Sequence, residues 1–136
     1  MIPPITPELL SLLKDFKRQH PWTGDLTDRK NKFIILNRCL NELFHKEVEL
    51  DTSRVVDGVS SYNSYIPVVG GVMAQKIIMI GKLSVITYLH EYAHILDANE
   101  FEAQNWAIEL YKQIFPKNFV NLHIDDSGFA SLEVDP

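Results

Sequence analysis

Apolar residues follow two different periods in this chain, and the change between them constrains the fold more than any other feature. Before residue 46 they recur every three or four positions, which is typical of amphipathic helices. This spacing predicts a helix that begins after Thr6 and a second helix that begins after Asp25 or Thr27 and runs to about His45. Between Val48 and Gly81 the apolar residues instead form short β-branched runs, which are typical of strands. The pattern predicts an α+β fold.

The central segment contains the expected strands. Its apolar runs cover residues 55–56, 65–69 and 76–80, and Gly70-Gly71 separates the last two runs. We expect a small, largely antiparallel sheet of about three strands joined by hairpins. Pro67 indicates that its own strand is an edge strand or is bulged there, because proline cannot donate a ladder hydrogen bond.

Two further helices are predicted after the sheet. Gly81-Lys82 turns the chain, and Ser84 is a suitable N-cap for a helix from Val85 to about Leu96. A short turn over residues 97–99 leads to another helix, which runs to Phe115 and stops at Pro116. In this helix we expect Phe101 and Trp106 to lie in the core.

Length and charge favour a single soluble domain over residues 1–136, with residues 121–136 as a loosely docked tail. The net charge of −5 and the scattered basic residues argue against a nucleic-acid partner. No apolar run approaches the roughly 20 residues that a membrane span needs. The single cysteine, Cys39, cannot form an internal disulfide, and residues 1–4 lack the features of a signal peptide. We therefore expect a cytoplasmic protein without a membrane partner.

The sequence His90-Glu91-Tyr92-Ala93-His94 is an HExxH motif within a predicted helix. Residues four apart lie on one helix face, so both imidazoles can reach one zinc ion. Glu91 is rotated by about 100° around the helix axis and does not reach the metal itself. It lies close enough to act as a general base toward a water molecule that zinc activates.

A third zinc ligand is expected downstream of the motif. Asp97 lies too far along the same helix, whereas a residue of the following helix can fold back across the first. We favour Glu102, since Ala103 and Ala107 allow the two helices to approach closely. Glu102 also completes a capping box with Asn99 as N-cap. The alternative third ligands are Glu100, Glu109 and His123.

The segment from Gly81 to Pro116 resembles a zincin metallopeptidase whose third ligand is a glutamate. More narrowly, the stretch from Glu100 to Leu110 resembles the second motif of the ImmA/IrrE-type family, with Gln104 as one extra residue. The resemblance implies an HExxH helix packed beside a small sheet whose edge strand, here residues 76–80, pairs with an extended peptide. It also implies that His90, His94 and Glu102 hold one zinc ion.

These observations together predict a zinc-dependent metallopeptidase that acts on a protein or peptide substrate, with Glu91 as the catalytic base. Oxyanion stabilisation could involve Tyr62 or Tyr65, although strand packing is the favoured role for both, and core packing is favoured for Tyr92. The alternative is a regulatory zinc domain that binds a partner without turnover. In that case a further protein ligand, such as His123 or Asp97, would close the fourth coordination position.

Overall fold

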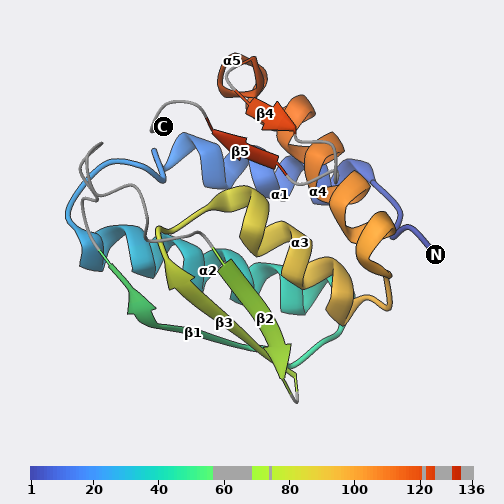
Figure 1. Cartoon of the computed structure of the whole chain (residues 1–136), viewed down its shortest axis with the longest axis horizontal. Coiled ribbons are helices and arrows are strands. Elements are labelled where there is room, and N and C mark those ends of the chain that lie inside the picture. Colours follow the sequence, from blue (N-terminus) through green and yellow to red (C-terminus); the bar gives the residue numbers. More distant parts are fainter. Residues whose placement is uncertain (57–68, 74, 121, 125–129, 133–136) are drawn as a thin grey trace.

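The computed structural model describes residues 1–56, 69–73, 75–120, 122–124 and 130–132 of the 136-residue chain. These residues form a mixed arrangement of helices and strands, so the predicted α+β class is confirmed (Figure 1). The helices are α1 (Pro7–Arg18), α2 (Leu26–Phe44), α3 (Val85–Ile95), α4 (Glu100–Ile114) and α5 (Pro116–Phe119). The strands are β1 (Glu49–Val55), β2 (Val69–Met73), β3 (Lys76–Gly81), β4 (Leu122–Ile124) and β5 (Ala130–Leu132).

The four long helices begin at polar caps, as the sequence predicts. The side chains of Thr6, Asp25, Ser84 and Asn99 each accept a hydrogen bond from a backbone N–H in the first turn. Such a bond satisfies a donor that has no partner within the helix. At Asn99 the capping box is complete, because the Glu102 carboxylate also accepts from the Asn99 N–H. Local capping therefore fixes where each helix starts.

The three-stranded sheet is mixed, and its order is β1-β3-β2. Strand β2 pairs antiparallel with β3, as expected of a hairpin, but β1 pairs with β3 in parallel. The prediction that residues 76–80 form an edge strand is wrong, because β3 lies at the centre and β2 at the edge. Gly70-Gly71 lies within β2 and does not separate two strands. Of the predicted 65–69 strand, residues 65–68, including Pro67, lie outside the described residues.

Helix α3 lies between the sheet and α4 (Figure 1). It is enclosed almost all round, since every residue from Val85 to Ala93 except Thr87 is buried. The sheet turns Ile77 and Met79 of β3 toward the core, and both are fully buried. The helix that carries HExxH is thus a central element of the fold.

Buried and partly buried hydrogen bonds connect α3 to α2. The hydroxyl of Tyr88 donates to Asn37 Oδ1 at 2.7 Å, and that of Tyr92 donates to Asn41 Oδ1 at 2.9 Å. Both asparagine amides donate in turn to the Val48 carbonyl, at 2.8 and 2.9 Å. Two tyrosines one turn apart on α3 therefore pair with two asparagines one turn apart on α2. Tyr92 packs in the core, as predicted.

The two aromatic residues in the first half of α4 lie in different surroundings. Trp106 is fully buried, as predicted, whereas Phe101 is 75% exposed and does not belong to the core. Phe101 stands in the first turn of α4, where its side chain points away from the packed face. In the predicted 121–136 tail, β4 and β5 pair antiparallel. Among the described residues, no helix combines the length and apolar character needed to cross a lipid bilayer.

Candidate metal centre

The turn between α3 and α4 brings the start of α4 back over the HExxH helix. Asp97 adopts a left-handed conformation with φ of 68°, which reverses the chain before the Asn99 cap. Ala93, Ala103 and Ala107 are all fully buried. Their small side chains permit the close approach of the two helices that the sequence predicted, and this approach places residues of α4 beside the histidines.

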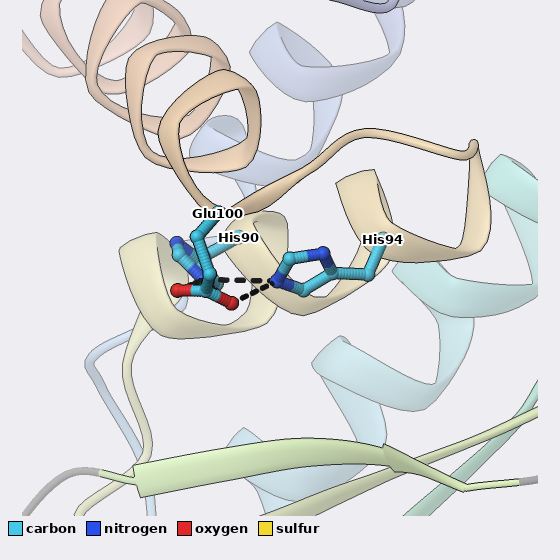
Figure 2. A group of neighbouring side chains, drawn as sticks. All are labelled: His90, His94 and Glu100. Carbon is cyan, nitrogen blue, oxygen red and sulfur yellow. Dashed lines mark hydrogen bonds and ion pairs between the residues drawn. The ribbon is translucent and has the colours of Figure 1, made fainter.

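His90, His94 and Glu100 form a group whose ligand atoms all lie within 4.8 Å of one another. Figure 2 shows the two imidazoles and the carboxylate converging on a common point, with both histidines supplied by α3 and the glutamate by the first residue of α4. The two Nε2 atoms are 3.2 Å apart. The carboxylate oxygens of Glu100 lie 2.6 Å from His94 Nε2 and 3.3 Å from His90 Nε2.

The other nitrogen of each ring has its own partner. Nδ1 of His94 lies 2.9 Å from the Ala98 carbonyl oxygen, and Nδ1 of His90 lies 2.8 Å from Oε1 of Gln104. Each Nδ1 therefore lies within hydrogen-bonding distance of an oxygen atom outside the group, and each Nε2 is directed toward the common point. Two ring nitrogens and a carboxylate then face one another at contact distance. Such an arrangement needs a proton or a metal ion between the groups.

The separations agree with a zinc site. In a tetrahedral site with bonds of about 2.0–2.1 Å, neighbouring ligand atoms lie about 3.3–3.4 Å apart. The distances from His90 Nε2 to the other two groups are close to this value. The distance between His94 Nε2 and Glu100 Oε1 is that of a charge-assisted hydrogen bond, and zinc binding would lengthen it. Two neutral imidazoles and a carboxylate are also a ligand set that zinc accepts.

The histidines also affect the ionisation of Glu100. Partial burial acts to raise its pKa, but the positive charges of His90 and His94 in their protonated forms, together with the hydrogen bonds from both rings, outweigh this effect and lower the pKa. The carboxyl group is therefore held in its ionised form, which is the form that binds a metal.

Glu102, the favoured third ligand of the sequence analysis, is not brought to this group. Its Oε1 accepts from the Asn99 N–H at 3.0 Å, and its Oε2 lies 2.6 Å from the N-terminal ammonium of Met1. The carboxylate is committed to the capping box, and Glu100, an alternative in that analysis, takes the place beside the histidines. Glu109 accepts from Gln113 on the exposed side of α4, and His123 lies in β4, with its side chain outside the described residues.

Glu91 is buried beside the histidines, with 8% of its surface exposed. Burial raises the pKa of its carboxyl group; the charges of His90 and His94 act to lower it, and that of Glu100 raises it further. A raised pKa makes a carboxylate a better proton acceptor near neutral pH.

Strand β2 packs directly against Glu91 at Gly70. A β-carbon at this position would lie 3.1 Å from Glu91 Cγ and 3.3 Å from Thr87 Cγ2. The absence of a side chain at Gly70 thus lets the edge strand approach the motif. Neither this contact nor the role of Gln104 was identified from the sequence. Tyr62 and Tyr65 lie outside the described residues.

Comparisons of the chain with protein-family models, with curated proteins and with solved structures found no match.

Proposed function

We propose that this protein is a zinc-dependent peptidase in which His90, His94 and Glu100 hold one zinc ion and Glu91 is the general base. The observation that carries the proposal is the convergence of two imidazole Nε2 atoms and a carboxylate on one point. Each imidazole is oriented by an acceptor at its Nδ1 atom. Hydrogen bonds of this kind are typical of histidines that bind metal.

The number of ligands supports a catalytic role. Within the described ranges, the group that can hold a metal contains three side chains, and catalytic zinc sites characteristically use three protein ligands and leave the fourth position open. A bound zinc ion would supply a Lewis acid that polarises a carbonyl group and lowers the pKa of a water molecule to about 7. Glu91 would accept the proton of that water and deliver it to the leaving amine.

Strand β2 is the part of the sheet that supports a role in peptide binding. In the part of the chain that the structure describes, it is an edge strand and contacts α3, and an edge strand offers backbone groups with which an extended peptide can pair. In this proposal β2 replaces the strand of residues 76–80, whose central position leaves no edge. The substrate would be a protein or peptide segment in extended conformation.

The alternative is a zinc domain that binds a partner without turnover. The low exposure of Glu91 favours it, because a general base has to reach the water that it deprotonates. The two functions differ in what the Glu91 carboxylate does, so one substitution separates them.

The deciding experiment measures zinc content and peptide hydrolysis on the same preparations. The wild type should contain about one zinc ion per chain and cleave members of a fluorogenic peptide library. Glu91→Gln should retain the zinc and lose cleavage, and Glu109→Gln, an exposed carboxylate of α4, should change neither. Zinc binding without cleavage in the wild type would favour the alternative. A wild type that binds no zinc would refute both.

A further inference from the structure

Gln104 stands one turn after Glu100 on α4, so one face of this helix carries both residues that touch the histidines. Its Oε1 atom lies 2.8 Å from His90 Nδ1, and its side chain is partly buried. His94 receives the corresponding contact from the backbone carbonyl of Ala98. The two rings are therefore oriented by different means, one by the backbone and one by a side chain.

This contact decides which nitrogen of His90 is available. A neutral imidazole has one N–H and one lone pair, and an acceptor at Nδ1 places the lone pair on Nε2. The same hydrogen bond fixes the rotation of the ring, so that Nε2 points toward His94 and Glu100. Without it, the ring can turn and the tautomers can exchange.

We propose that Gln104 is the positioning residue of the metal centre, through which α4 sets both the tautomer and the orientation of His90. The inference rests on the zinc site of the proposed function. Glu100 and Gln104 are separated by one helical turn. The same packing of α4 against α3 therefore brings Glu100 to the two histidines and places Gln104 at Nδ1 of His90.

The test compares three variants in the full chain. Gln104→Met keeps the length of the side chain but removes the acceptor, and Gln104→Glu keeps an acceptor. Gln113→Met makes the same change on the exposed side of the same helix and serves as the control. For each protein, zinc affinity is measured by competition with a chelator, and thermal stability is measured without metal. The Nδ1 proton of His90 is observed by NMR in the zinc-loaded form.

We expect Gln104→Met to bind zinc about 10- to 100-fold more weakly and to lose the slowly exchanging Nδ1 proton signal. Gln104→Glu should restore both, and Gln113→Met should match the wild type. If Gln104→Met binds zinc as the wild type does, the positioning role is overturned while the proposed function stands. Equal weakening in Gln104→Met and Gln104→Glu would also overturn it, because the contact would then serve only packing. Absence of zinc binding in the wild type would refute the proposed function itself.

Discussion

An alanine at position 70 would place a methyl group in the narrowest part of the contact between β2 and α3. Its carbon would lie 3.1 Å from Glu91 Cγ, 3.3 Å from Thr87 Cγ2 and 3.3 Å from the Ile78 carbonyl oxygen. All three distances are shorter than an ordinary van der Waals contact, and Ile78 belongs to the central strand, whose backbone cannot yield easily. The edge strand or the Glu91 side chain must therefore move.

The neighbouring glycine provides a matched control. A β-carbon at Gly71 would meet no atom within 4 Å, so Gly71→Ala adds a methyl group without a clash. Overpacking typically costs about 1–3 kcal/mol. Replacing glycine by alanine at a compatible position stabilises by about 0.4–1 kcal/mol, because the unfolded chain loses freedom. Gly71→Ala should thus be neutral or slightly stabilising, and Gly70→Ala should be less stable than Gly71→Ala by about 1–3 kcal/mol.

The assays are urea unfolding, zinc affinity and peptide cleavage, each measured for the two variants and the wild type. Because Gly70 touches Glu91 and not the three proposed ligands, Gly70→Ala should reduce peptide cleavage more than zinc binding. Equal stability of Gly70→Ala and Gly71→Ala would refute the argument, since it would show that β2 does not lie against Glu91 as described.

Three further outcomes are expected. Glu100→Gln should weaken zinc binding at least tenfold, as measured by competition with a chelator. Glu102→Ala, which removes the acceptor of the capping box, should keep zinc and lower the free energy of unfolding by about 0.5–1.5 kcal/mol in urea unfolding. The reverse pattern would return Glu102 to the metal. Zinc at 100 times its dissociation constant should stabilise the wild type by about 2.7 kcal/mol, which is measured as a shift of the thermal unfolding curve. His94→Ala should abolish this shift. A shift that persisted in His94→Ala would argue against the site. Tyr88→Phe should lower stability by about 1–3 kcal/mol, because it leaves buried Asn37 Oδ1 without its donor; unchanged urea unfolding would show that this bond contributes nothing.

Helix positions could be predicted from the sequence because their determinants are local. Thr6, Asp25, Ser84 and Asn99 each cap the helix that follows, and a cap acts over only three residues. The HExxH spacing likewise identified His90 and His94, since residues four apart share a helix face.

The sheet order could not be predicted in the same way. Strand β1 pairs in parallel with β3, and β2 lies between them in the sequence but outside them in the sheet. A parallel pairing between strands so far apart in sequence leaves no local signal, whereas the β2–β3 hairpin does. Gly70-Gly71 suggested a turn, although Gly70 is required for the close approach of β2 to Glu91.

The third member of the metal group depends on how α4 is rotated against α3. The capping box at Asn99 was visible in the sequence, and it already gave Glu102 a partner. Only the packing of the two helices shows that Glu100 faces the histidines while Phe101 faces solvent. Gln104 was visible only as an extra residue in a family pattern, and its contact with His90 is tertiary.

Helix α3 is held in place by contacts on nearly all of its sides. A helix packed on nearly all sides, and tied to α2 through Tyr88 and Tyr92, cannot tilt without breaking several contacts at once. Glu100, in contrast, has a side chain that is 70% exposed and stands at the very start of its helix. Among the described elements around the histidines, the first turn of α4 is thus less constrained by packing than α3.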